Sequence, residues 1–215
     1  MADTLTTPEV DALDALRVSP AAHLAEAMEA ASAASVSGAE GQAVSLREIP
    51  FTVQLGVRAI PGSESAQAVE SSLGVTLPTA VGEVTGDADG LHVIWMSPDE
   101  FLAVDVSRRQ RPGETIAAEA ALEGLPGQVV DLSANRTILV LEGTEARSVL
   151  EKTCRADLHP RAFAVGSAIL TQVGQVPVIL HRTAEHTYRL FPRASFAEHL
   201  VRWLLDGMRE FTKDA

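Results

Sequence analysis

Three histidines in the last quarter of the chain have the residue type for metal or acid–base chemistry. His181 falls at the end of one expected strand and His186 at the start of the next, so the two could approach across a turn. Two imidazoles make an incomplete zinc site, and no third ligand follows at a familiar spacing. His199 lies at the margin of an apolar helical stripe. We therefore expect strand-end and boundary residues here, not metal ligands.

The segment CRADLHPRAF contains the residue types of a thiol enzyme. A Cys154 thiolate would need a base and a group to orient that base, which Asp157 and His159 could supply. However, Cys154 follows directly on an amphipathic helix, where a small apolar side chain is often simply buried. Pro160 favours a turn at this point, because it disfavours the helical region for the residue before it. The pattern favours a buried cysteine, with a thiol enzyme as the alternative.

Sequence signatures for phosphate and dinucleotide binding are missing: neither Gly-x-Gly-x-x-Gly nor Gly-Lys-Ser/Thr occurs. The stretch GSES after Pro61 offers a helix start that could take an anion. Four arginines could form a basic face, a solvated surface or anchors for a protein interface, and we favour the last. They are Arg182, Arg189, Arg193 and Arg202. We expect no catalytic, cofactor-binding or metal-binding residue in this chain.

The composition of the chain limits its partners and its compartment. A net charge of −12 and an aromatic content of 4% argue against binding to nucleic acid. A single cysteine excludes an internal disulfide and fits a reducing compartment. The first residues lack the pattern of a signal peptide, and no apolar run approaches the roughly 20 residues of a spanning helix. We expect a cytoplasmic protein without a membrane partner.

Residues 1–44 form the first segment of the expected organisation. They are rich in Ala, Ser, Glu and Asp, and contain too little bulky apolar surface to make a core alone. We expect a partly helical or extended N-terminal arm that is mobile or lies along another surface.

Residues 45–134 are expected to form a first folded half. Apolar side chains alternate with polar residues or glycine over 51–57, which predicts a half-buried strand that begins near Pro50 or lies at an edge. Ser63 as N-cap and Gly74 as the C-terminal stop bound a helix. Two short strands at 91–96 and 101–106, a helix over 112–124 and a strand in GQVVDL complete this half.

Residues 135–215 are expected to form a second half with the same order of elements. RTILVLEG predicts a strand, and Thr144 is a candidate cap for the helix that follows. A pair of strands broken near Gly174 and a further strand in HTYRLFPR come next. The pattern Ser195-x-x-Glu198 predicts a capping box for the last helix. Its apolar stripe is Phe196, Leu200, Trp203, Leu204, Met208 and Phe211.

This repeated order predicts an α+β protein of two split β-α-β, ferredoxin-like halves, each with helices on one face of an antiparallel sheet. Four segments carry a further resemblance: SPAAHL, LREIPFTVQLGVRAIPGS, VIWMSPDEFLAV, and VDLSANRTILVLEGTEARSVLEKTCRADLHPRAF continued by VGQVPVILHR. Together, and in this order from about Ser19 to Met208, they resemble the gamma subunit of heterotetrameric sarcosine oxidase.

This resemblance implies a fold like the folate-binding domain of the aminomethyltransferases. It also implies a complex of alpha, beta, gamma and delta subunits that oxidises sarcosine to glycine and forms hydrogen peroxide and 5,10-methylenetetrahydrofolate. FAD, FMN, NAD and tetrahydrofolate would be held by the larger subunits and zinc by the delta subunit. The gamma chain itself would bind no cofactor, would not be catalytic, and would contact the alpha subunit most directly.

Two other functions stay open at this point. The small subunit of N-methylglutamate dehydrogenase shares the architecture that the resemblance implies. A self-standing folate-binding protein of the aminomethyltransferase type is the second alternative, although the chain is short for a third subdomain. By contrast, an amine oxidase in its own right would need a cofactor as electron acceptor, and no segment resembles a site for one.

Overall fold

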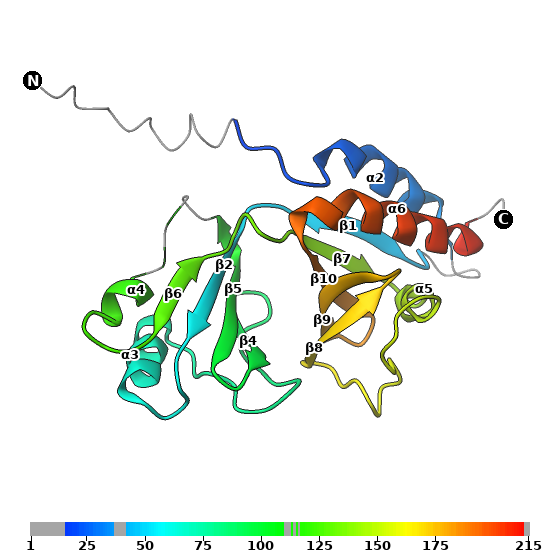
Figure 1. Ribbon diagram of the computed structural model, residues 1–215. Helices are drawn as coiled ribbons and strands as arrows, with labels where there is room; N and C mark the ends of the chain where they lie inside the picture. Colours follow the sequence, from blue (N-terminus) through cyan, green and yellow to red (C-terminus); the bar gives the residue numbers. More distant parts are fainter. Residues whose placement is uncertain (1–15, 37–41, 110–112, 114, 116, 213–215) are drawn as a thin grey trace, which may run out of the picture.

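The computed structural model describes residues 16–36, 42–109, 113, 115 and 117–212. Its strands form two antiparallel five-stranded sheets that lie side by side (Figure 1). The first sheet has the order β3-β4-β5-β2-β6, with β2 (Thr52–Arg58), β3 (Val84–Gly86), β4 (Leu91–Ser97), β5 (Glu100–Arg109) and β6 (Gln128–Asp131). The second has the order β1-β7-β10-β9-β8, with β1 (Ser45–Ile49), β7 (Ile138–Glu142), β8 (Ala168–Val173), β9 (Val176–Ala184) and β10 (Thr187–Pro192).

Helices cover the outer face of each sheet. On the first sheet these are α3 (Glu64–Leu73) and α4 (Ala118–Ala121). On the second they are α2 (Ala25–Ala34), α5 (Ala146–Glu151) and α6 (Ala197–Met208), with the 3₁₀ turns η1 (Ala22–Leu24), η2 (Ala194–Phe196) and η3 (Arg209–Phe211). The expected α+β architecture, with helices on one face of each antiparallel sheet, is confirmed.

The two sheets repeat one arrangement of elements. In the first, β2 is followed by α3, then by the pair β4 and β5, then by α4 and β6. In the second, β7 is followed by α5, then by the pair β9 and β10, then by α6. The place beside β7 that corresponds to that of β6 is taken by β1, a strand from much earlier in the chain.

The position of β1 divides the chain differently from the expected boundaries. Ser45 to Ile49 fall in the expected first half, yet these residues pair with β7, with Ser45 opposite Glu142 and Ile49 opposite Ile138. The chain passes from the second sheet to the first through the turn at Pro50 and Phe51, where Phe51 has a φ of 59°. Pro50 has no backbone N–H to donate to a sheet. It therefore stands just after the end of β1 and before the start of β2, which belongs to the other sheet.

The described part of the expected arm is partly helical and lies along another surface of the chain. Ala21, Leu24 and Met28 are buried in the core of the second sheet, with η1 and α2 packed along β1 and α6. Ser19 is held by a 2.5 Å hydrogen bond to the Glu48 carboxylate. The few apolar residues of this segment thus complete a core that the rest of the chain supplies. Residues 1–15 and 37–41 lie outside the described residues.

A layer of side chains fills the space between the two sheets. We call it the inter-sheet layer, and its apolar members are Ile94, Leu102, Val104, Ile138, Ala168, Ile179 and Phe191. The strand expected at 51–57 is present as β2, but the prediction that it is half-buried is wrong. Val53 and Leu55 face the helices, and Thr52 and Gln54 on the other face are buried as well, because the inter-sheet layer covers that face. Each sheet has no solvent face over its central strands, because its second face packs on the other sheet.

Helix α3 confirms the local prediction at both of its ends. The Ser63 hydroxyl oxygen accepts a hydrogen bond from the Ala66 backbone N–H at 3.2 Å, which satisfies one of the free donors of the first turn. Gly74 ends the helix with a φ of 70°, a conformation that glycine adopts without strain. The helix expected at 112–124 is limited to the single turn of α4, and its expected first residues at 112, 114 and 116 lie outside the described residues.

The capping predictions in the second half are wrong. Helix α6 continues directly from η2, so Ser195 lies inside a helical turn and makes no cap hydrogen bond. Glu198 instead binds Arg202 at 2.9 Å. Thr144 does not cap α5 either, since that helix starts after Glu145 without a side-chain cap.

The apolar stripe of α6 is rotated relative to the expected one. Ala197, Leu200, Val201, Leu204 and Met208 are buried, which at about 1.5–3 kcal/mol for each fully buried large side chain anchors the helix on the second sheet. The two aromatic residues at 196 and 203, expected in the stripe, are more than 40% exposed.

Candidate functional site

The first candidate site is a polar cluster at one end of the inter-sheet layer. His92 on β4 and His181 on β9 face each other from opposite sheets, with ring centroids 5.2 Å apart. Arg189 on β10 is paired with His181 in the sheet and reaches across to the first sheet, where it donates to the Asp89 carboxylate at 2.9 Å and to the Ala88 carbonyl. Both histidines are at most 1% exposed and Arg189 is 6% exposed.

Burial and neighbouring positive charge lower the pKa values of both histidines in this cluster, which keeps their side chains neutral. Desolvation, followed by the repulsion of His92 and Arg189, lowers the pKa of His181 to about 3. Desolvation also lowers the pKa of His92, although its Nδ1 lies 3.2 Å from the Gly90 carbonyl oxygen, which opposes this effect. Neutral imidazoles enclosed between two sheets have no route to a substrate proton. The cluster therefore fixes how the sheets pack and is not suited to acid–base catalysis.

The structure separates the histidines that the sequence placed near one another. His181 lies within β9 and points between the sheets, whereas the His186 side chain is half-exposed at the β9–β10 turn, 3.8 Å from the Glu185 carboxylate. His199 lies on the surface of α6 and stacks on Trp203 at 6.0 Å, consistent with a boundary residue. Within the described ranges, no group of three or more His, Cys, Asp or Glu side chains could hold a metal ion.

The three residues of the thiol-enzyme alternative do not form a constellation. The Asp157 carboxylate accepts from the His159 backbone N–H at 2.9 Å, and the His159 Nδ1 accepts from the Arg161 backbone N–H at 3.2 Å. These bonds build a local turn, as Pro160 suggested. The Cys154 thiol is half-buried and lies 3.9 Å from the Thr171 hydroxyl. Among the described residues, Thr171 is the hydrogen-bonding contact of this sulfur, and Asp157 and His159 are engaged in the turn.

The remaining predicted positions also have structural partners. The helix start at GSES is occupied by its own serines, since the Ser63 hydroxyl caps the helix and lies 2.8 Å from the Ser65 hydroxyl. Arg182 is buried and donates to the carbonyl oxygens of Phe163 and Glu185 at 2.7 and 2.8 Å. Arg202 forms an ion pair with a carboxylate one helical turn earlier. These residues do not join into one basic face with Arg193.

The second candidate site is a surface beside the gap between the sheets, which we call the Arg136 surface. It consists of Arg136, Arg155 and Arg193 together with Leu170 and Pro177. A hollow of about 460 Å³ lies against β8 and β9 and is lined by Arg136 and Arg155. A smaller hollow of about 160 Å³ lies between the sheets and is lined by Arg136 and Arg193. Arg136 thus belongs to both hollows.

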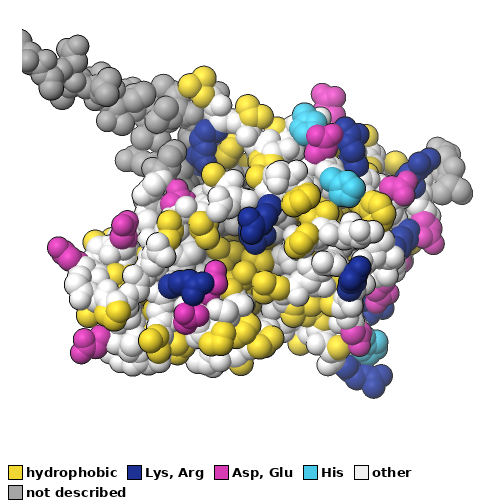
Figure 2. All heavy atoms as spheres, viewed as in Figure 1, with side chains coloured by type: hydrophobic (Ala, Val, Ile, Leu, Met, Phe, Trp, Pro, Cys, Tyr) yellow, Lys and Arg dark blue, Asp and Glu magenta, His cyan; other side chains and the backbone are white. Residues whose placement is uncertain are grey.

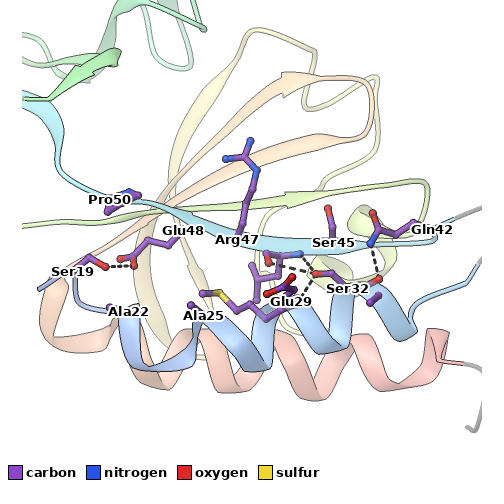
Figure 3. Close-up of a pocket in the computed structure, with 13 residues that line it drawn as sticks. Ser19, Ala22, Ala25, Glu29, Ser32, Gln42, Ser45, Arg47, Glu48 and Pro50 are labelled. Carbon is purple, nitrogen blue, oxygen red and sulfur yellow. Dashed lines mark hydrogen bonds between the residues drawn. The ribbon is translucent and has the colours of Figure 1, made fainter.

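A further hollow, of about 600 Å³, is the groove between α2 and β1. Figure 3 shows that some of the polar groups in its walls bond to one another, among them Ser19 with Glu48 and Gln42 with Ser32. The Ser32 hydroxyl accepts from the Leu46 N–H at 3.0 Å, and the Gln42 amide donates to the Ser32 carbonyl at 2.6 Å. Glu48 is held by the Ser19 and Thr137 hydroxyls, both at 2.5 Å. The groove is the seam along which α2 covers an edge strand, and several of its polar groups are engaged in bonds that hold this seam together.

Sequence reasoning missed several residues of these sites, among them His92 and Arg136. His92 carries a signal that could have been used, because it occupies an inward position of an otherwise apolar strand, LHVIWM. Arg136 carries no such signal, since it stands in a short link between β6 and β7 and is defined by what surrounds it in space.

In the part of the chain that the structure describes, no helix is both long enough and apolar enough to cross a membrane.

The fold and the structural roles of the polar residues define a small two-sheet protein of the aminomethyltransferase fold. The solved structure of the glycine cleavage system aminomethyltransferase T from Bartonella henselae superposes with a TM-score of 0.59, covering 88% of this chain and 57% of that chain. At 17% sequence identity, this similarity shows the fold alone.

The family follows from matches over most of the chain. The model of the sarcosine oxidase gamma subunit family matches residues 58–210. The sarcosine oxidase subunit gamma of Corynebacterium sp. (strain U-96) is 53% identical over 92% of both chains, and that of Arthrobacter sp. is 52% identical over the same shares. A chain of the heterotetrameric sarcosine oxidase from Corynebacterium sp. U-96, solved in complex with pyrrole 2-carboxylate, matches with a TM-score of 0.83 and 53% identity, covering 91% of this chain and 96% of that chain. This chain belongs to the sarcosine oxidase gamma subunit family.

Proposed function

We propose that this chain is the non-catalytic gamma subunit of a heterotetrameric sarcosine oxidase. The observation that carries the proposal is the match over nearly the full length of a chain from such a heterotetramer, at 53% identity and a TM-score of 0.83. In this role the chain packs on the alpha subunit most directly and helps to hold the complex with the beta and delta subunits. The complex would be cytoplasmic and would demethylate sarcosine to glycine with formation of hydrogen peroxide and 5,10-methylenetetrahydrofolate.

The polar residues of the chain support a structural role over a catalytic one. His92 and His181 are neutral and enclosed, Cys154 has no base directed at its thiol, and the start of α3 is capped by its own serine. We therefore assign FAD, FMN, NAD, tetrahydrofolate and zinc to the other subunits. The relatives named above all carry the sarcosine oxidase name, which favours this function over that of the N-methylglutamate dehydrogenase subunit.

The direct test compares the isolated chain with the assembled enzyme. The isolated chain is expected to give no sarcosine-dependent hydrogen peroxide and no binding heat with tetrahydrofolate in titration calorimetry. Co-expression with the alpha, beta and delta subunits should give a complex that contains this chain, identified by native mass spectrometry, and that oxidises sarcosine. Turnover by the isolated chain, or folate binding by it, would contradict the proposal.

A second prediction separates this function from the thiol-enzyme alternative. Cys154→Ser keeps a small side chain that can still contact the Thr171 hydroxyl, so the fold should be retained. Because we assign the thiol no chemical role, the assembled enzyme carrying this variant should oxidise sarcosine at a rate within about twofold of the unmodified enzyme. A loss of activity of about a hundredfold with unchanged assembly would instead make Cys154 part of the reaction.

A further inference from the structure

The Arg136 surface stands out in an otherwise acidic protein because, among the described residues, no carboxylate forms an ion pair with its arginines. The chain carries a net charge of −12, and other arginines, such as Arg58, Arg189 and Arg202, are each paired with a carboxylate. Within the described residues, no ion pair joins a carboxylate to Arg136, Arg155 or Arg193. Figure 2 shows Lys and Arg side chains beside a central apolar area, with acidic side chains at the margins and beside one of these basic groups.

Arg136 is placed so that it attracts an anion. Its Nη1 donates to the Phe191 carbonyl at 3.0 Å, which holds the guanidinium between the two hollows. Partial burial and the nearby Arg193 charge both lower the pKa of Arg136, so the charged form is held at a cost in free energy. A carboxylate brought to this position would relieve the repulsion between the two guanidinium groups.

The backbone of β8 provides a second feature at the same place. β8 is the edge strand of the second sheet, and its outward-facing backbone groups belong to alternate residues. The Ala168 N–H donates to the Gly82 carbonyl at 3.1 Å, and the Gln172 carbonyl accepts from the Arg155 N–H at 3.2 Å. Leu170 lies between these two covered positions and, among the described residues, no group outside its own sheet bonds to its N–H or C=O. Its side chain is 55% exposed.

We propose that the Arg136 surface, with the β8 edge at Leu170, is the site where an extended acidic segment of another oxidase subunit docks. The segment pairs with the free backbone groups of Leu170, covers its side chain, and places a carboxylate against Arg136 and its neighbours. This inference rests on the proposed function, because it gives the subunit a defined contact within the heterotetramer. The α2–β1 groove is less suited to such a partner, since the Leu46 N–H and C=O at this edge already bond to the Ser32 hydroxyl.

The test uses charge reversals in the co-expressed four-subunit enzyme. Arg155→Glu and Arg193→Glu change exposed side chains, and both keep the backbone hydrogen bonds at these positions. Arg161→Glu is the matched control: it alters net charge equally but lies in the turn after His159, away from both hollows. Each test variant should weaken binding of the gamma chain to the other subunits by about tenfold or more, and the double variant by more. The control should bind within about twofold.

Two further measurements add to the comparison of binding strengths. In the unmodified enzyme, the Leu170 amide should exchange hydrogen more slowly in the complex than in the isolated chain. Higher salt should weaken the binding of the unmodified chain more than that of the double variant. Equal binding of all variants with an unprotected Leu170 amide would overturn the docking site. A homodimer of the isolated chain that the same reversals dissociate would also overturn it, in favour of a second copy as the occupant. If the unmodified chain fails to join the complex at all, the proposed function itself fails.

Discussion

Acidification below pH 6.5 is expected to destabilise the isolated chain through its buried histidines. The folded-state pKa of His181 is lowered to about 3, whereas the unfolded chain should titrate near 6.5. Between these two values the unfolded state binds a proton that the folded state does not, so stability falls as the pH falls. For His181 alone this amounts to about 2 kcal/mol between pH 6.5 and pH 5, at about 1.4 kcal/mol per pH unit. His92, whose pKa is also lowered, adds to the effect.

Urea unfolding at pH 7, 6 and 5 measures this dependence. His181→Gln removes the titrating group, so its stability should depend less steeply on pH than that of the unmodified chain, whatever its stability at pH 7. His186→Gln is the control, because the His186 side chain is about half-exposed at a turn and should leave the steep dependence intact. The same slope in all three chains would show that the buried cluster does not determine the acid sensitivity.

Gly143→Ala, which adds a single methyl group, is expected to lower the free energy of unfolding more than the other glycine substitution that we consider. Gly143 follows β7 with a φ of 128°, and a Cβ there would overlap the Ala43 carbonyl oxygen and lie 2.8 Å from the Val44 Cα. Both of these are backbone atoms just before β1, so the clash cannot be relieved by the movement of a side chain. The strain and the displacement of this segment should together cost about 3 kcal/mol or more.

Thermal unfolding tests this prediction against a matched glycine. Gly166 also has a positive φ, of 84°, but a Cβ there would meet nothing within 4 Å. Gly166→Ala should therefore cost only about 1–2 kcal/mol, from the backbone conformation alone. For a chain of this size, the loss at Gly143 corresponds to a melting temperature lower by about 6–12 °C, and the loss at Gly166 to about 2–8 °C. Equal shifts would mean that contact with the Ala43 segment is unimportant.

Features set by neighbouring residues could be predicted from the sequence, and those set by packing between distant segments could not. The helix from Ser63 to Gly74 depends on a cap, a short apolar pattern and a glycine stop, all within twelve residues. The strand at β2 was predicted as half-buried because alternation alone cannot reveal that a second sheet covers the other face. Ser195 failed as a cap for a similar reason, since a 3₁₀ turn before α6 already continued the helix.

The same division applies to the candidate sites. The structural roles of Cys154 and His199 followed from the helices beside them. Arg189, however, bonds to Asp89, a residue 100 positions earlier, and such a contact leaves no local pattern. The Arg136 surface likewise joins the link before β7 to β8 and β9, so only the folded chain brings its charges together.

The placement of β1 has a consequence for how the molecule is made on the ribosome. Thr52 to Asp131 contain every strand of the first sheet, so that sheet can form as soon as this stretch has emerged. β1 emerges earlier still but must wait for β7, with Ser45 and Glu142 separated by 97 positions. Until then the apolar side chains of β1 stay exposed to solvent. The completed first sheet then lies in the sequence between β1 and β7, which are not yet paired. The second sheet closes last, and its closure joins the segment around Ala21 to Met28 and helix α6 in one core.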